Sequence, residues 1–288
     1  MTKRWFTRLL SALAPPRRVI VHAHMFKNAG STFDWSLARS LPQGFVDHRD
    51  DEQMKTGAGY LADWLTANRD CAALSSHWVT PPLPRQRGLE LHLCMLLRDP
   101  IERMRSVYQF ERSQQGVETP GSIRAKQMSF CEYMAWQMQP MPGPVVKNYQ
   151  TRYCSGDYLG VDLDSMFERA SALLRNTPGI GLVHRYDESM VYFEYLLRPA
   201  FPSLDLSYIK QNVSPDSGQE LSRRRESVLS ELGELADQVL AANHYDLQLF
   251  ELANSCFEQR LQAVPDFEAR LRELRDRNQS LAAGSAPC

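Results

Sequence analysis

One short segment near the start of the chain constrains the fold more than any other feature. Residues 19–24 (VIVHAH) form a buried-strand pattern, residues 26–31 (FKNAGS) contain turn-forming residues, and residues 32–41 repeat apolar side chains at helical spacing. A strand that is apolar throughout is typical of a parallel sheet with helices on both faces. This strand, loop and helix therefore indicate an α/β protein.

The rest of the chain continues the alternation of strands and helices. Further strands are predicted at residues 71–75, 91–97 and 180–184, and helices at 130–138, 163–175, 189–197, 222–242 and 246–261, with another helix starting at Pro100. Such alternation predicts a P-loop-like, three-layer α/β/α fold with a central parallel sheet and a helical C-terminal part. We expect a basic arm at residues 1–18, one domain at 19–262, and a tail at 263–288 that is helical and then flexible.

Charge and cysteine content exclude several classes of protein. The net charge of -1 over 288 residues does not indicate a nucleic-acid binder, and no apolar run is long enough to span a membrane. Six scattered cysteines form no C-x-x-C pair and no zinc-ligand spacing. We therefore expect a reduced, cytoplasmic protein without a metal site.

The N-terminal arm carries five basic side chains and no acid. Its apolar stretch, residues 9–14, is short, is cut off on one side by Arg8 and is followed by Pro15 and Pro16, so we do not predict an export signal. Two interpretations stay open. The arm is a frayed, solvated leader, or residues 3–13 form an amphipathic helix on the inner face of a membrane.

The loop between the first strand and helix has the composition of a phosphate site. Gly30 permits close backbone approach, Lys27 supplies a positive charge, and Ser31 and Thr32 supply hydroxyl groups at a helix N-terminus. The G-x-x-x-x-G-K pattern of a Walker A loop is absent. The alternative is a loop that only turns the chain.

A second candidate follows the strand at residues 91–97. Arg98 stands at the carboxyl end of that strand, where ligands bind in open α/β sheets, and arginine suits bidentate phosphate recognition. Asp99 can cap the next helix, Pro100 suits its first position and Glu102 its third. Alternatively, Arg98 forms a structural salt bridge with Asp99.

Together, these two motifs resemble those of the sulfotransferases related to heparan sulfate 2-O-sulfotransferase. Residues 24–32 (HMFKNAGST) are similar to the 5′-phosphosulfate loop H-x-P-K-T-G-G-T-S, and residues 98–108 (RDPIERMRSVY) to the 3′-phosphate motif R-D-P-x-x-R-x-x-S-x-Y. Weaker similarity continues at residues 148–156, 181–189 and 243–251, so that the resemblance covers about residues 19–260. Phe26, Asn28 and Ala29 replace the usual Pro, Thr and Gly, and His184 replaces a common acidic residue.

The resemblance implies a reaction, a cosubstrate and a set of site residues. The sulfuryl donor would be 3′-phosphoadenosine 5′-phosphosulfate (PAPS), and the acceptor a hydroxyl of a glycan or glycolipid. The residues implied to hold the 5′-phosphosulfate are Lys27, Asn28, Ala29, Gly30, Ser31 and Thr32, and those implied to hold the 3′-phosphate are Arg98 and Ser106. Lys27 would also stabilise charge on the departing phosphate oxygen.

The resemblance also assigns a general base. His77, just beyond the predicted strand at residues 71–75, matches the family histidine that acts on the acceptor hydroxyl, and Ser75 stands where the family has a second histidine. The unperturbed pKa of histidine suits this role. The alternative for His77 is core packing beside Trp78, and we expect His22 and His24 to support the loop.

Two rival functions and several decoys complete the sequence-based predictions. A nucleotide-dependent kinase would bind ATP in the same loop and use Asp99 for Mg²⁺, and a non-catalytic module would bind a nucleotide or a sulfated ligand. The basic residues that meet an acidic glycan, or are merely solvated, are Arg103, Arg105, Arg112, Arg124 and Lys126. Residues 57–62 match G-x-G-x-x-A but are predicted as a turn before a helix, residues 223–225 (RRR) as a solvated face or an anion grip, and the glycosylation pattern at Asn212 as without function.

Overall fold

A five-stranded, all-parallel sheet forms the centre of the molecule. The computed structural model describes residues 15–140, 143–209 and 220–284. The strands are β1 (Arg17–Ala23), β2 (Phe45–Asp47), β3 (Ala73–Ser76), β4 (Leu89–Leu97) and β5 (Ile180–Leu182), arranged in the order β2-β3-β1-β4-β5. The central strand β1 is buried from Val19 onward, as its apolar sequence predicts.

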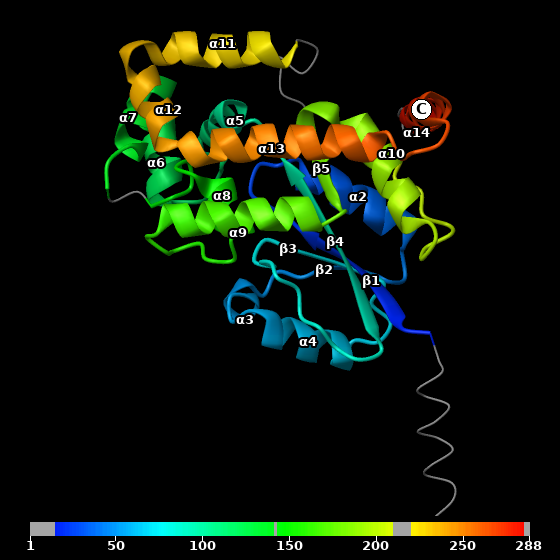
Figure 1. The fold of residues 1–288 in the computed structure, drawn as a ribbon. Helices are drawn as coiled ribbons and strands as arrows, with labels where there is room; N and C mark the ends of the chain where they lie inside the picture. Colours follow the sequence, from blue (N-terminus) through cyan, green and yellow to red (C-terminus); the bar gives the residue numbers. More distant parts are fainter. Residues whose placement is uncertain (1–14, 141–142, 210–219, 285–288) are drawn as a thin grey trace, which may run out of the picture.

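Helices pack on both faces of this sheet, which confirms the predicted three-layer α/β/α fold (Figure 1). The helices are α2 (Gly30–Ser40), α3 (Asp51–Met54), α4 (Ala58–Ala67), α5 (Pro100–Ser113), α6 (Pro120–Gln127), α7 (Phe130–Gln137), α8 (Tyr149–Cys154), α9 (Leu163–Asn176), α10 (Tyr186–Leu197), α11 (Leu221–Leu232), α12 (Ala236–Ala242), α13 (His244–Leu261) and α14 (Phe267–Gly284). Two short 3₁₀ helices, η1 (Val183–Arg185) and η2 (Gly233–Leu235), lie between them.

Parallel pairing brings the carboxyl ends of four strands to one edge of the sheet. Ala23 at the end of β1 is in register with Ser76 at the end of β3, and Leu97 at the end of β4 with Leu182 at the end of β5. The residues that directly follow these strands therefore emerge together. In open α/β sheets this edge is where ligands bind.

Element boundaries differ from the sequence-based predictions where a single residue redirects the chain. The strand predicted to reach residue 184 ends at Leu182, because Ser189 accepts a hydrogen bond from the Leu182 N–H at 2.8 Å and the chain turns into η1 and α10. The single helix predicted for residues 222–242 is two helices, since Gly233 has a φ of 54° and breaks the run after α11. Strand β2 and the short helices α3, α6 and α8 were not predicted, because segments of three to eight residues show no clear period.

The C-terminal segment is part of the folded domain rather than a tail that follows it. Helix α14 continues to Gly284 and packs against α10, and its side chains Leu271 and Leu274 are buried in the main core (Figure 1). The prediction that the domain ends at residue 262 is therefore wrong for α14, because the apolar spacing of Leu271 and Leu274 gives this helix a buried face. Residues 285–288 lie outside the described residues.

The predicted N-terminal arm is described only from residue 15. Its last two arginines belong to β1, where Arg17 donates from Nη1 to the Leu65 carbonyl at 2.7 Å. Residues 3–13, proposed above as a membrane-binding helix, and Asn212 lie outside the described residues. In the described ranges, every helix is too short or too polar to cross a bilayer.

Candidate functional site

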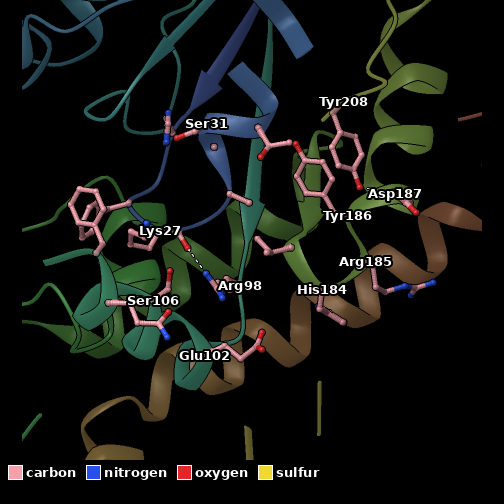
Figure 2. A pocket seen from close by; sticks show the side chains of 18 of the residues that line it. Lys27, Ser31, Arg98, Glu102, Ser106, His184, Arg185, Tyr186, Asp187 and Tyr208 are labelled. Carbon is pink, nitrogen blue, oxygen red and sulfur yellow. Dashed lines mark hydrogen bonds between the residues drawn. The ribbon is translucent and has the colours of Figure 1, made fainter. Parts of the chain in front are cut away.

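A cavity of about 830 Å³ opens at the edge where the strands end, and it collects nearly all the predicted site residues (Figure 2). The predicted residues that line it are Lys27, Ala29, Gly30, Ser31, Thr32, His77, Arg98 and Ser106. They come from four separate segments of the chain: the β1–α2 loop and helix α2, the end of β3, the end of β4, and α5. The fold thus unites residues that lie up to about 80 positions apart in the sequence.

The β1–α2 loop places the start of α2 against the cavity. Lys27 and Ala29 both have left-handed backbone conformations, with φ values of 63° and 60°. Ala29 is the N-cap of α2 and provides no side-chain hydrogen bond to the first turn. The Thr32 N–H donates to the Ala29 carbonyl at 3.3 Å, and the N–H groups of Gly30 and Ser31 are the ones suited to an anion, as at other helix N-termini that bind phosphate.

Gly30 is required here by the close approach of His24. A Cβ atom built on Gly30 would lie 2.2 Å from Cδ2 of His24 and 2.4 Å from its Nε2. No carbon atom fits at such distances, so only glycine allows the His24 ring to lie against the first residue of α2.

Asn28 is the one predicted site residue that does not line the cavity. Its side chain is buried, and Nδ2 donates to the Leu96 carbonyl at 2.7 Å and to Oε1 of Gln150 at 2.8 Å. Its backbone N–H donates to the Met25 carbonyl. The side-chain amide and the backbone N–H of Asn28 thus both anchor the loop to the interior of the protein. The prediction that Asn28 holds the ligand is therefore wrong for both of these groups.

Arg98 faces the cavity and is not paired with its neighbour Asp99. Asp99 is 1% exposed, accepts the Glu102 N–H at 2.9 Å as the N-cap of α5, and lies 3.8 Å from Arg225. The alternative of an Arg98–Asp99 salt bridge is thus wrong. The Nη1 of Arg98 donates to the Lys27 carbonyl at 3.3 Å, which links the two cation-bearing segments (Figure 2).

Two half-buried cations, Lys27 and Arg98, line one side of the cavity. Burial and the nearby guanidinium groups of Arg98 and Arg103 lower the pKa of Lys27 to about 8, and burial lowers the pKa of Arg98. Neither Lys27 nor Arg98 forms an ion pair within residues 15–140, 143–209 and 220–284. Charges that lose part of their hydration are normally paired, so these two half-buried cations favour the binding of an anion.

The other basic residues proposed for an acidic acceptor have different environments. Arg103 is 2% exposed, donates from Nε to the Phe26 carbonyl at 3.0 Å, and stacks on the Tyr149 ring at 3.7 Å. Arg103 is therefore a structural residue, and both interpretations offered for it are wrong. Arg105 pairs with Glu231, and Arg112 donates to the Tyr108 hydroxyl.

His77 lines the cavity with one ring nitrogen already committed. Its Nδ1 lies 2.8 Å from the His24 carbonyl oxygen, which can only accept, so Nδ1 carries the proton. Burial, with a contribution from His24, lowers the pKa of His77, which keeps the ring neutral at pH 7. Nε2 is then unprotonated and is free to act as a base. His77 is not a core residue, since it lines the cavity.

The His24 ring packs against His77 and belongs to a buried cluster with His22 and Asp34. The sequence analysis named the two histidines but missed Asp34. Asp34 of α2 holds two histidines of β1: its Oδ1 is 2.7 Å from Nδ1 of His22, and its Oδ2 is 2.8 Å from Nδ1 of His24. Burial raises the pKa of Asp34, but its contacts with His22 and His24 outweigh burial and lower it. The signal in the sequence was an aspartate between Phe33 and Trp35, on a helix that follows alternating histidines.

The polar atoms of His22, His24 and Asp34 all lie within 4.8 Å of one another, which is close enough to hold a metal ion. Hydrogen bonds already account for this geometry, because each Nδ1 donates to its own carboxylate oxygen. We therefore treat the cluster as a hydrogen-bonded unit. His24 supports the loop as predicted, and in addition it lines the cavity.

A second set of lining residues forms an aromatic wall that the sequence analysis did not assign. In Figure 2, Lys27, Arg98 and Ser106 lie together, and His184, Tyr186 and Tyr208 lie across from them. The rings of Tyr186 and Tyr208 pack edge to face at 4.7 Å. Among the described residues, the buried Tyr186 hydroxyl has no hydrogen-bond partner. This wall offers aromatic surface to a ligand held by the cations.

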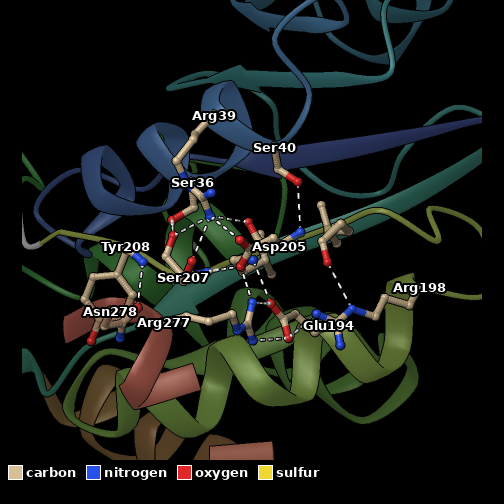
Figure 3. Close-up of polar contacts among 12 residues, drawn as sticks. Ser36, Arg39, Ser40, Glu194, Arg198, Asp205, Ser207, Tyr208, Arg277 and Asn278 are labelled. Carbon is tan, nitrogen blue, oxygen red and sulfur yellow. Dashed lines mark hydrogen bonds and ion pairs between the residues drawn. The ribbon is translucent and has the colours of Figure 1, made fainter. Parts of the chain in front are cut away.

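Helix α14 holds this wall in place (Figure 3). Asn278 accepts the Tyr208 N–H at 2.8 Å, and Arg277 donates to both carboxylate oxygens of Glu194 at 2.8 Å. The Tyr208 hydroxyl donates to Asp187 at 2.6 Å. The C-terminal segment, predicted as a tail, thus helps to shape the cavity.

The remaining motifs of the resemblance form the support beneath the cavity. Asp246 accepts the N–H groups of Gln150 at 3.0 Å and Thr151 at 2.7 Å, and its own N–H donates to Asn148 at 3.0 Å. Gln150 in turn contacts Asn28 and Arg98. Segments about 95 residues apart therefore position the two cation-bearing segments relative to each other. Arg224, from the run at residues 223–225, lines the cavity and pairs with Glu102.

Comparison with known proteins gives a relative but no function. The sequence matches no family model. It is 28% identical over 245 residues to an uncharacterized protein of Archaeoglobus fulgidus, and the match covers 82% of this chain and 95% of that protein. The similarity thus extends over almost the whole archaeal protein, and it assigns no activity.

Proposed function

We propose that this protein is a PAPS-dependent sulfotransferase that transfers a sulfuryl group to a hydroxyl of a glycan or glycolipid. The observation that carries the proposal is the pair of half-buried cations, Lys27 and Arg98, which line one cavity with the N-terminus of α2 and with His77. Among the described residues neither cation has a carboxylate partner, so the cavity is suited to a ligand with more than one anionic group.

Each group of PAPS has a complementary part of the cavity in this proposal. The 5′-phosphosulfate is held by Lys27, by the N–H groups of Gly30 and Ser31, and by the hydroxyl groups of Ser31 and Thr32. The 3′-phosphate is held by Arg98 and Ser106. The distance that Gln150 maintains between the two segments then sets the spacing of the two anionic sites.

The reaction uses His77 and Lys27 in separate roles. Nε2 of His77 accepts the proton of the acceptor hydroxyl as its oxygen forms a bond to sulfur. The bond between sulfur and the phosphate oxygen breaks, and 3′,5′-adenosine bisphosphate (PAP) leaves with the electron pair. The Lys27 ammonium group stabilises the charge that develops on that phosphate oxygen. Positioning and electrostatic stabilisation thus supply most of the rate enhancement.

The kinase alternative is disfavoured by Asp99. A kinase of this design would need Asp99 to reach Mg²⁺ beside the nucleotide phosphates. Asp99 instead caps α5, is 1% exposed and does not line the cavity. The glycan or glycolipid acceptor rests on the family resemblance, as does the choice of PAPS over another doubly anionic nucleotide.

Calorimetric titration with PAP and, separately, with ATP and Mg²⁺ tests the proposal. We expect PAP to bind, and Arg98→Ala to weaken PAP binding about tenfold to a hundredfold, since a charge-assisted hydrogen bond is lost. Arg87→Ala removes an exposed arginine outside the cavity and is the control, expected to leave PAP affinity unchanged. Preference for ATP, or no PAP binding, would overturn the proposal.

A further inference from the structure

The side chain of His24 lies where an anion at the start of α2 would bind. It lines the cavity, and its Nε2 would be 2.4 Å from a Cβ atom on Gly30, the first residue of the helix. Its other ring nitrogen, Nδ1, is 2.8 Å from Oδ2 of Asp34. The ring is therefore fixed between a buried carboxylate and the N-terminus of α2.

In this arrangement the neutral His24 ring presents a hydrogen-bond acceptor to an anion, where a donor is needed. Asp34 is ionised, so Nδ1 of His24 must carry the proton that it donates to Asp34. In the neutral ring Nε2 then offers only a lone pair, and phosphate and sulfate oxygens are likewise acceptors. Close contact between them is repulsive unless Nε2 takes up a proton, which the negative charge of Asp34 favours.

We propose that His24 takes up a proton when the anion binds and then donates a hydrogen bond from Nε2 to the phosphosulfate. The proton comes from solvent, and the ring becomes an imidazolium held between Asp34 and the bound anion. His24 is on this view a binding residue whose charge appears only when the ligand is present. The inference rests on the proposed function, because it takes the anion to be the phosphosulfate of PAPS.

The charged groups around His24 determine whether anion affinity rises or falls with pH. Asp34 on α2 favours the imidazolium, whereas His22 on β1, His77 after β3 and Arg49 after β2 disfavour an added positive charge. In the free protein burial is the largest influence and lowers the pKa of His24. A bound anion opposes the effect of burial and raises the pKa of His24. Affinity for the anion is therefore greatest at low pH and falls as pH rises through the pKa of His24 in the complex.

The test measures anion affinity as a function of pH. PAP and inorganic sulfate are titrated by calorimetry from about pH 5.5 to about pH 7.5, and sulfate is included because it exchanges no proton in this range. For the wild type we expect the affinity for sulfate to fall by up to about tenfold per pH unit over part of the range. His24→Gln should remove this dependence, and its proton uptake on binding PAP should be smaller by about one.

Two further variants keep the test decisive. His77→Gln should retain the pH dependence, because the proton is taken up at Nε2 of His24, whereas His77 only packs its ring 4.2 Å from the His24 ring and places its Nδ1 against the His24 carbonyl. Asp34→Asn removes the charge that favours the imidazolium and should reduce proton uptake, and it serves if His24→Gln fails to fold by circular dichroism. The same pH dependence in the wild type and in His24→Gln, or in Asp34→Asn where His24→Gln does not fold, would overturn the inference.

The outcomes also separate this inference from the proposed function. Sulfate binding linked to His24 in a protein that does not bind PAP would retain the inference for a simple anion and reject PAPS. PAP binding without linkage to His24 would retain the sulfotransferase proposal and reject the role of His24.

Discussion

The side-chain amide of Gln150 is hydrogen-bonded to both backbone groups of Arg98: its Oε1 accepts the Arg98 N–H at 2.9 Å, and its Nε2 donates to the Arg98 carbonyl at 2.8 Å. The same Oε1 accepts from Asn28. One fully buried amide thus joins the loop that carries Lys27 to the strand end that carries Arg98. Together with the hydrogen bond from Arg98 Nη1 to the Lys27 carbonyl, this amide sets the separation of the two cation-bearing segments.

Replacement of Gln150 by leucine should destabilise the protein and weaken ligand binding. The change leaves the Arg98 N–H and one of the two Nδ2 protons of Asn28 without their partner, while the other Nδ2 proton still binds the Leu96 carbonyl. Each unsatisfied buried donor costs about 1–3 kcal/mol. We expect the free energy of unfolding to fall by about 2–4 kcal/mol in urea denaturation. Gln139→Leu, at an exposed position, is the matched control. Equal stability of the two variants would show that the amide does not hold the segments together.

Gly30→Ala should disrupt the site without a general loss of stability elsewhere. A methyl group there would lie 2.2 Å from the His24 ring, so the ring must move away from the start of α2. We expect PAP affinity to fall by about tenfold or more, since an anion-binding hydrogen bond is lost. Gly59→Ala is the control, because its methyl group meets no atom within 4 Å and alanine stabilises a helix by about 0.5–1 kcal/mol over glycine. Unchanged PAP affinity in Gly30→Ala would contradict the close contact.

The sequence predicts the sheet, the loop and most of the cavity lining, because these depend on local pattern. The apolar run at residues 19–24 and the Asp99-Pro100 helix start are signals contained within a few residues. Parallel strands then bring their carboxyl ends together by topology alone. This is why Lys27, His77 and Arg98 could be expected in one place.

What the sequence does not reveal are contacts that depend on packing between distant segments. Asn28 resembles a loop residue that binds a ligand, yet the buried acceptor on Gln150, 122 positions away, draws it inward. Arg103 is in a basic cluster, yet the Tyr149 ring and two carbonyl groups bury it. Tyr208 lies in a segment without periodicity, and α14 brings it to the cavity. No local pattern encodes such pairings.

Removal of the Arg277 side chain should loosen α14. Arg277 binds Glu194, which is 4% exposed, and also contacts Asp205. Arg198 lies 2.7 Å from Glu194 and partly replaces the lost charge, so we expect Arg277→Ala to lower the free energy of unfolding by about 1–3 kcal/mol. Hydrogen exchange should quicken in α14. Arg272→Ala removes an exposed arginine of the same helix and should change neither quantity. Unaltered exchange in Arg277→Ala would show that α14 is held by its apolar face alone.

Replacement of His77 by alanine should strongly slow sulfuryl transfer and leave PAP binding intact. Transfer is measured with ³⁵S-labelled PAPS and a panel of glycans and glycolipids, and His244→Ala, at an exposed position, is the control. A general base contributes about 10²–10⁴-fold to the rate, so the loss should be of that size. A non-catalytic binding module would show no transfer in the wild type. A wild type that transfers sulfate and a His77→Ala variant that is equally active would place the base elsewhere.

The pH dependence of sulfuryl transfer follows from the titration of His77 and Lys27. His77 must be neutral to accept a proton, and its pKa is lowered from 6.5, so kcat at saturating PAPS, where binding through His24 no longer limits the rate, should rise with pH and level off below neutrality. Lys27 must be charged, and its pKa of about 8 means that kcat/KM should fall above about pH 8. Bound PAPS raises the pKa of Lys27, so the descending limb of kcat should lie at higher pH than that of kcat/KM. Since Lys27→Arg keeps its charge in this range, it should lose the descending limb, and persistence of that limb would assign it to another group.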